Sequence, residues 1–233
     1  MGISKLFLTI LAAFAAGILG GLAAFSYLFG NPFISGNGLN FSPVRVTEKQ
    51  VTTVQENNAL KDAAAKVANV AIGVKVTGAG GAVAYGSGLI LTSDGLVVVP
   101  YSLFPPGSNA EVTAGGKKAT FEVVKRDKGS NLAILKLEAS NWPTASFYQL
   151  DNLKLGERIF LAGKLSSGGN FVNEGVVRDF DENVINTNII DQVSAQGSPA
   201  FDIEGNIMGI ATVDKSGWVS IIPISKIKEA SGL

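Results

Sequence analysis

The chain of 233 residues carries 19 basic and 19 acidic side chains, so its formal net charge is zero. No basic block or stripe occurs, which argues against a nucleic-acid partner. Cysteine is absent, which excludes disulfides, thiolate metal sites and a cysteine nucleophile. Histidine is absent too, so a metal could be held only by carboxylate or carbonyl oxygens. We expect neither a metal nor another cofactor.

An uncharged apolar run from Leu6 to Phe29 follows a short tail of residues 1–5. At a rise of about 1.5 Å per residue, a helix of this length crosses a bilayer. The alternative is a cleaved signal peptide, whose apolar core is usually shorter, about 7–15 residues. The small residues Ala23 and Ala24 keep cleavage open. We expect an uncleaved transmembrane helix. No cysteine follows, which excludes a lipoprotein anchor.

The flanking charges predict how this helix is oriented. Lys5 precedes the apolar run, and the next basic residue is Arg45. Positive charge favours the cytoplasmic side, so we expect a cytoplasmic N-terminus and an extracytoplasmic remainder, in a membrane that the sequence does not identify. Two sets of small residues repeat every four positions and allow close helix packing in lipid, and with it self-association into a homo-oligomer: Ala13, Gly17 and Gly21, and Ala16, Gly20 and Ala24.

The rest of the chain predicts mostly strands. Residues 30–55 have no sustained period and indicate a linker, after which Asn57 or Asn58 caps a short helix that ends at Asn69. Short Val-, Ile- and Leu-rich strands then follow at close spacing, which is typical of a barrel or sandwich. They are 70–77, 85–92, 96–99, 120–125, 132–137, 158–162, 171–177, 184–190, 207–213 and 218–222. Residues 224–230 are expected to form a closing helix.

Three segments, taken in order, resemble the trypsin-like domain of HtrA (DegP-type) serine proteases. Residues 86–95 read GSGLILTSDG, which is similar to the family's GSG strand and hairpin. Residues 126–136 contain RD followed by SNLAILK, where the family has RD and TDLAVLK. Residues 185–210 contain INTN, QGSPAF and EGNIMGI, where the family has IQTDA, NSGGPL and DGEVIGI.

The resemblance covers about residues 56–233 and implies an all-β fold of two six-stranded barrels with a cleft between them. The first barrel would span about 56–143 and the second about 144–233. The residues Trp142–Thr144 would cross from one to the other. No residues remain after Leu233 for the PDZ domain of longer family members, so we expect a member without one.

The three catalytic positions of the family fall on residues with other chemistry. A serine protease needs a hydroxyl nucleophile, an imidazole base and a carboxylate that orients the imidazole. In the matched segments the histidine position falls on Ser102, the aspartate position on Asn131 and the serine position on Gln196. Because the chain has no histidine, no shift of the alignment restores a triad. We therefore expect a pseudoprotease rather than an enzyme.

The loop that forms the oxyanion hole in the family is altered as well. The glycine two positions before the nucleophile becomes Ser194, and the Gly-Gly after it becomes Gly197-Ser198. Glycine adopts the backbone conformation that this loop needs at low cost, and serine does not. An alternative is a Ser–Lys pair that joins Ser102, Ser194 or Ser198 to Lys164 or Lys215, although no spacing singles out such a pair.

Two functions of different classes remain. In the family, substrate adds as a strand to a sheet edge beside a side-chain pocket, and that binding does not require the triad. The matching edge would be Ala211, Thr212 and Val213, with a pocket formed by Asp191, Gln192 and Val193. One expectation is therefore a peptide- or protein-binding adaptor module. The other is a structural subunit of an envelope or secretion assembly, which would use an apolar face away from this edge.

Overall fold

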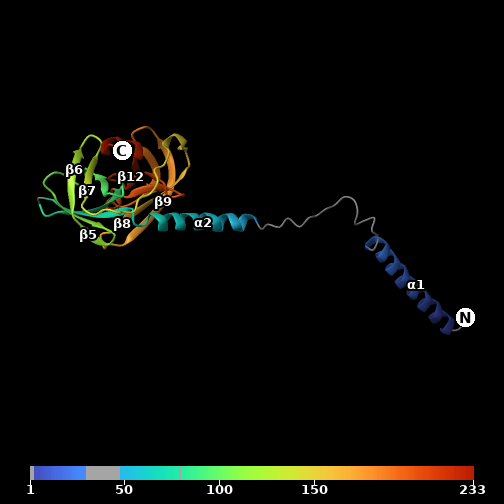
Figure 1. Ribbon diagram of the computed structural model, residues 1–233. Helices are drawn as coiled ribbons and strands as arrows, with labels where there is room; N and C mark the ends of the chain where they lie inside the picture. Colours follow the sequence, from blue (N-terminus) through green and yellow to red (C-terminus); the bar gives the residue numbers. More distant parts are fainter. Residues whose placement is uncertain (1–2, 30–47, 79) are drawn as a thin grey trace. The chain divides into compact units, whose positions relative to one another are not determined.

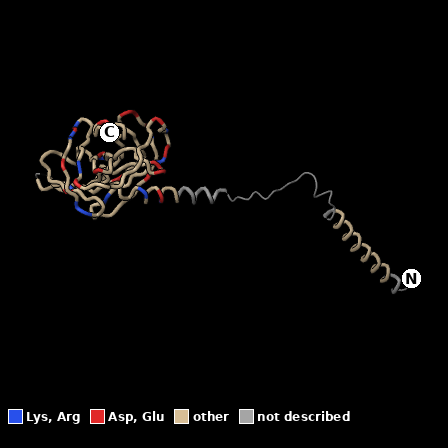
Figure 2. Tube along the Cα trace, in the orientation of Figure 1, with Lys and Arg blue, Asp and Glu red and all other residues tan. Residues whose placement is uncertain are grey.

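The computed structural model describes the backbone of residues 3–29, 48–78 and 80–233 (Figure 1). Helix α1 (Ile3–Phe29) contains the apolar stretch Phe7–Tyr27, with a mean hydropathy of 2.1, long enough to cross a membrane by length and composition. No charged side chain interrupts this stretch (Figure 2). A signal sequence near the N-terminus can meet the same criteria of length and composition. Residues 1–49 and 50–233 form two separate compact units.

Helix α2 (Glu48–Val67) begins earlier than the sequence indicated. The last part of the expected linker, 48–55, is helical, while residues 30–47 lie outside the described residues. The composition of this helix is mostly polar, and its C-terminal part supplies the core residues Ala63 and Val67. The sequence located that part because its apolar residues recur at helical spacing, and missed the polar beginning.

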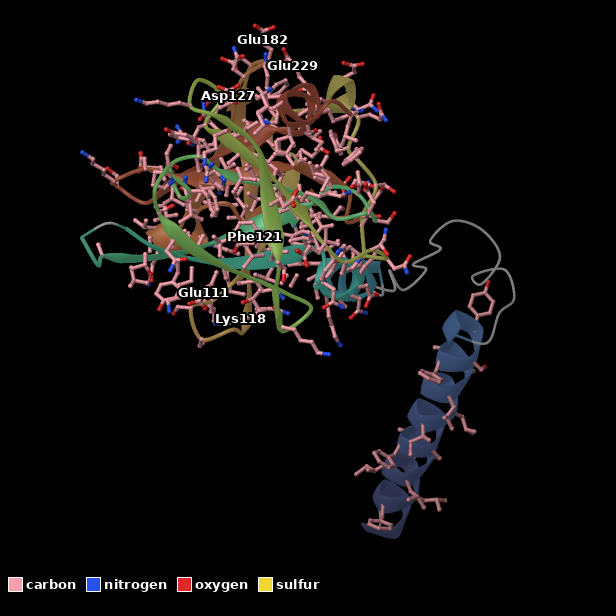
Figure 3. All side chains as sticks on the ribbon, turned by 60° about the vertical axis from the view of Figure 1, so that its left-hand side comes forward. Glu111, Lys118, Phe121, Asp127, Glu182 and Glu229 are labelled. Atoms are coloured by element: carbon pink, nitrogen blue, oxygen red, sulfur yellow. The ribbon has the colours of Figure 1, made fainter. Side chains whose placement is uncertain are left out.

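The first barrel is built on one seven-stranded antiparallel sheet in the order β5-β4-β1-β2-β3-β7-β6. Its strands are β1 (Ala71–Thr77), β2 (Val83–Ile90), β3 (Leu96–Pro100), β4 (Asn109–Ala114), β5 (Lys117–Ala119), β6 (Phe121–Asp127) and β7 (Leu132–Leu137). Its core contains aliphatic side chains such as Ile72, Val97 and Leu135. Phe121 of β6 is labelled in Figure 3. It packs edge-on against Phe104 of this core, with the ring centroids 5.8 Å apart.

The second barrel is closed, with six strands in the order β10-β13-β12-β11-β8-β9. These are β8 (Arg158–Lys164), β9 (Asn170–Phe180), β10 (Ile185–Ile190), β11 (Pro199–Asp202), β12 (Ile207–Val213) and β13 (Trp218–Pro223). Helix α3 (Ile224–Ser231) follows β13 directly. The double barrel predicted from the resemblance is thus confirmed, with one seven-stranded sheet and one closed six-stranded barrel.

The two barrels share a core. One buried cluster joins Leu89, Val98 and Ile134 of the first barrel to residues of the second, and α3 adds Ile224 and Ile227. Phe160 and Phe201 stack in this cluster with ring centroids 5.4 Å apart. A continuous apolar contact of this kind holds the two barrels in one arrangement, so loops from both can build a site between them.

The sequence analysis did not predict three of the strands, which are β4, β5 and β11. β4 (NAEVTA) buries only Val112 and Ala114, and β5 (KKA) is short and buries none of its side chains. Neither contains the run of apolar residues that marks the other strands. β11 begins at Pro199 and pairs with β8 and β12 over only a few residues. Each is defined by its neighbours and not by its own composition.

Candidate functional site

The residues at the three matched catalytic positions lie together, although they come from distant segments. Ser102 follows β3, Asn131 precedes β7, and Gln196 follows the short 3₁₀ helix η2 (Val193–Ala195). The backbone N–H of Ser102 donates to Asn131 Oδ1 at 2.9 Å. The side-chain Nε2 of Gln196 donates to Ser102 Oγ at 3.0 Å. The three positions therefore form one hydrogen-bonded chain.

Asn131 sets the turn that carries Ser102. Its φ of 55° lies in the left-handed region, which asparagine tolerates better than most residues. Its carbonyl oxygen accepts the N–H of Tyr101 at 2.9 Å while its side chain accepts the N–H of Ser102. Both donors are backbone N–H groups, so these two bonds of Asn131 stabilise the turn and do not orient the side chain of Ser102.

Gln196 is the centre of the site. It is only 8 % exposed. Its Oε1 accepts the backbone N–H of Val213 on β12 at 2.7 Å, and its Nε2 donates to Ser102. Both polar ends of the amide are therefore paired, as buried polar groups need to be. An amide has no nucleophilic oxygen comparable to a serine alkoxide, and here it bridges the two barrels.

Four backbone N–H groups of the loop around Gln196 donate to carbonyl oxygens of the loop itself or of β12. The N–H of Ala195 donates to Gln192 O at 2.9 Å, and the N–H of Gln196 donates to Val193 O at 3.0 Å. The next two N–H groups, of Gly197 and Ser198, donate to Ala211 O and Ala195 O at 2.8 and 3.0 Å. An oxyanion hole requires N–H groups that point at the reacting oxygen. In this conformation the N–H of Gln196 is already bonded.

Gly197 allows the two barrels to meet at this loop. Its φ is 79°, and a Cβ built on it would lie 2.1 Å from the carbonyl oxygen of Ser87 on β2. The close approach places Gln196 O 2.8 Å from the N–H of Ser87, which donates to it. Only glycine combines this backbone conformation with this contact.

The serines and lysines considered for an alternative dyad do not meet among the described residues. Ser198 is fully buried, with its hydroxyl 3.5 Å from that of Ser87. Lys164 Nζ donates to Asn170 Oδ1 at 2.6 Å and to Ala68 O at 3.3 Å. Partial burial lowers the pKa of Lys164. Lys215 is exposed in the turn between β12 and β13. The backbone N–H of Lys164 donates to the hydroxyl oxygen of Ser87 at 2.9 Å, but among the described residues the hydrogen bonds of its side-chain Nζ go to Ala68 O and Asn170 Oδ1, and not to a serine hydroxyl.

A cleft of about 470 Å³ opens beside Gln196, between the two barrels. Val83 and Val193 at its rim are 48 % and 68 % exposed. None of the described lining residues is charged: they are Val83, Ala84, Tyr85, Ser102, Leu103, Val193, Ser194, Gln196 and Val213. The cleft therefore offers an apolar surface with a few neutral hydrogen-bonding groups.

The residues predicted for peptide binding lie near this cleft but differ in accessibility. Val193 and Val213 line it. Ala211 is fully buried, and its N–H donates to Ser198 O at 2.8 Å. The hydroxyl of Thr212 donates to Ser220 O at 3.2 Å. Their role in binding peptides stays a prediction.

The predicted pocket residues Asp191 and Gln192 are not among the residues that line the cleft, and Asp191 is hydrogen-bonded to neighbouring strands and turns. The carboxylate of Asp191 accepts from Asn173 Nδ2 at 2.8 Å and from the N–H of Gln192 at 2.7 Å. The N–H of Asp191 donates to Gly217 O at 2.9 Å. These bonds tie the end of β10 to the β12–β13 turn. Among the described residues, no group of three or more acidic side chains gathers closely enough to hold a metal ion.

Sequence reasoning missed one wall of the cleft. Val83, Ala84 and Tyr85 begin β2 directly before Gly86, where the sequence resemblance to the HtrA motif starts. Leu103 directly follows Ser102 and is 7 % exposed. No motif marks these residues, because their role depends only on the packing of one barrel against the other.

Two barrels with a cleft at their junction define the trypsin-like class of domains. The sequence model of the trypsin-like peptidase domain matches residues 78–210, more than half of the chain. The chain belongs to this family.

Several of its relatives are named as proteases of the DegP or HtrA type. A probable periplasmic serine endoprotease, DegP-like, of Chlamydia muridarum is 28% identical over 143 residues, covering 57% of this chain and 29% of the relative. The chain therefore matches less than a third of that protein's length. A solved structure of the HtrA-type protease AlgW with a tripeptide superposes with a TM-score of 0.67 at 20% identity, covering 74% of this chain and 62% of the other.

One relative has a different kind of name. The anti-sigma-I factor RsgI9 of Acetivibrio thermocellus is 28% identical over 166 residues, covering 66% of this chain and 22% of the relative. The trypsin-like region thus has similar counterparts in proteins named as proteases and in a protein named as a regulator.

Proposed function

We propose that this chain is a membrane-anchored, catalytically inactive trypsin-like domain that binds an extended peptide or protein segment in the cleft between its barrels. The observation that carries the proposal is the side-chain amide of Gln196, which stands at the nucleophile position and bridges Ser102 to Val213. The proposed role is that of an adaptor that presents or holds a partner without cleaving it.

The chemistry of the site supports the absence of hydrolysis. Proton transfer from a nucleophile needs a base near neutral pH, and the chain has no histidine. The Ser102 hydroxyl accepts a hydrogen bond from an amide, which neither removes its proton nor raises its nucleophilicity. The N–H of Gln196 that would stabilise an oxyanion donates to Val193 O instead.

The cleft supports binding, because it remains open beside this bridged site. In an active protease the energy of substrate binding is used to reach the transition state. In this chain the cleft between the barrels would bind its ligand without using the binding energy for a reaction. The anti-sigma-I factor among the relatives agrees with a regulatory use of such a domain.

Helix α1 supplies the proposed membrane anchor. Its apolar stretch, Phe7–Tyr27, is long enough to span the hydrocarbon core. The basic residue Lys5 before it and the lack of basic residues until Arg45 favour an extracytoplasmic domain. Extraction of membranes with alkaline carbonate tests the anchor. The intact chain should stay in the membrane pellet, and release of a shortened, soluble chain would contradict anchoring and indicate signal cleavage.

The proposed lack of catalysis is tested on the full chain in detergent micelles, with casein and a broad peptide library as substrates. An active HtrA protease serves as the positive control. We expect no turnover from the native chain or from Gln196→Ser, since that variant restores a hydroxyl without a base. Turnover that disappears when Ser102, Ser198 or Lys164 is replaced would instead establish a Ser–Lys enzyme.

A structural subunit is the second candidate, and one observation favours it. Ile190 and Trp218 are paired across β10 and β13 and are 59 % and 40 % exposed. Such a pair on a barrel face suits contact with another protein. Ile190→Lys would abolish assembly if this face were the functional one, and would leave cleft binding unchanged under the adaptor proposal.

A further inference from the structure

One edge of β2 has no partner strand along the cleft. β2 pairs with β1 over Val83–Leu89 but with β3 only at Leu89 and Ile90. In the part of the chain that the structure describes, no strand pairs with the other edge between Val83 and Gly86. An unpaired edge offers backbone N–H and C=O groups to an incoming strand.

The direction of these groups follows from the strand register. The N–H of Ser87 points away from β1, because it donates to Gln196 O. Backbone groups of alternate residues point to the same side of an antiparallel strand, and β1 and β2 pair without a bulge. The N–H and C=O groups of Val83 and Tyr85 therefore also point away from β1, toward the cleft that both residues line.

On the other side of the cleft, the backbone N–H groups of Ala211 and Val213 on β12 already have partners. The N–H of Val213 donates to the side-chain Oε1 of Gln196 at 2.7 Å. The N–H and C=O of Ala211 bond to Ser198 and Gly197. A peptide could accept the N–H of Val213 only by displacing the side-chain amide of Gln196, which is bonded at both ends, and this costs two hydrogen bonds.

We propose that the bound segment adds as a strand to the free edge of β2 at Val83 and Tyr85, while Gln196 keeps it off β12. This inference rests on the proposed peptide-binding function and names its binding edge. The ligand is an extended, uncharged, apolar segment, because no described residue lining the cleft is charged and a charged side chain would lose water there without a partner.

The pairing is tested with uncharged hexapeptides, acetylated at the N-terminus and amidated at the C-terminus. Binding to the full chain in micelles is measured by fluorescence anisotropy. The best binder is then remade with N-methyl groups on one or the other set of alternate amides. Alternate amides point to opposite sides of a strand, so each set reports one edge. Methylation of one set should lower affinity at least about tenfold, and methylation of the other less than about twofold.

Two variants connect this result to the named residues. Tyr85→Pro removes the N–H that points to the cleft and should lower affinity at least about tenfold. Its matched control is Val124→Pro, at the bulge on edge strand β6, where Val124 has no cross-strand partner. Gln196→Ala frees the N–H of Val213, so that a peptide can pair with β12 as well as with β2. In this variant, methylation of either set of amides should lower the affinity for the peptide. Circular dichroism and thermal unfolding check that each variant is folded.

The possible results distinguish a failure of the proposed β2 binding edge from a failure of the proposed peptide-binding function. Sensitivity of the native chain to both sets of methyl groups, or full binding by Tyr85→Pro, overturns the β2 edge while peptide binding stands. Binding of no peptide by the native chain or any folded variant overturns the peptide-binding function, and the β2 edge with it. Stronger binding of peptides with acidic or basic residues would overturn the uncharged ligand.

Discussion

Gln196 donates its side-chain N–H to the hydroxyl of Ser102 at 3.0 Å, across 94 positions of the chain and from one barrel to the other. In the matched family positions these residues stand where a nucleophile and a base would meet. Here an amide N–H donates to a hydroxyl oxygen, and neither side chain is a base near neutral pH. The pair therefore connects the two barrels.

Replacing Gln196 should destabilise the domain. Gln196→Ala leaves the N–H of Val213 and the hydroxyl of Ser102 without the partner they have in the native chain. Loss of two such bonds predicts about 1–3 kcal/mol of unfolding free energy. Denaturant unfolding measures it. The control is Gln192→Ala, at an exposed position, which should change stability by less than about 0.5 kcal/mol. Equal effects of the two variants would contradict a bridging role for Gln196.

A residue that replaces Asn131 needs a side-chain acceptor for the N–H of Ser102 and must tolerate a left-handed backbone conformation. Asn131→Ala loses the acceptor for the Ser102 N–H and places alanine in the left-handed region. A loss of about 1–3 kcal/mol is expected in the same unfolding measurement. Asn131→Asp keeps the acceptor and should cost less than Asn131→Ala. If alanine and aspartate behaved alike, the side-chain acceptor would not matter to the turn.

Gly197→Ala should be among the most damaging single changes in the domain. The added Cβ meets the Ser87 carbonyl at 2.1 Å, which forces the loop away from β2. We expect a loss of about 3 kcal/mol or more. Gly107 also has a positive φ, 78°, but open space around it, so Gly107→Ala isolates the conformational cost of about 1–2 kcal/mol. Thermal unfolding of the two variants separates the steric clash with the Ser87 carbonyl from the conformational cost of a positive φ. Similar melting temperatures would argue against the clash at Gly197.

Tyr148 should remain protonated in strongly alkaline solution. Burial, followed by its hydrogen bond to Glu157, raises the pKa of its phenol. The folded pKa exceeds the unfolded value of about 10, so the linked stability is fully present below that pH and is lost as pH rises above it. The difference in phenolate absorbance between the native chain and Tyr148→Phe should therefore appear well above pH 10 when folded and near 10 when unfolded. Appearance near 10 in the folded chain would contradict this linkage.

The sequence identified the fold because short motifs of the family recur in the right order, and local chemistry explains most of them. Strands such as Leu132–Leu137 and Ile207–Val213 were predicted with their observed bounds, since runs of buried aliphatic residues define them. The strands β4 and β5 were missed because they are mostly polar. The start of α2 was missed because a polar helix has no apolar period to detect.

The sequence by itself determined which chemistry the residues can perform. A chain without histidine has no imidazole, and glutamine at position 196 is no nucleophile in any fold. Only the tertiary structure decided what those residues do instead. The bridge from Gln196 to Ser102 and Val213, and the unpaired edge at Val83 and Tyr85, depend on segments far apart in the chain. Residue type decides chemical capacity locally, whereas partners and free edges arise when the two barrels pack together.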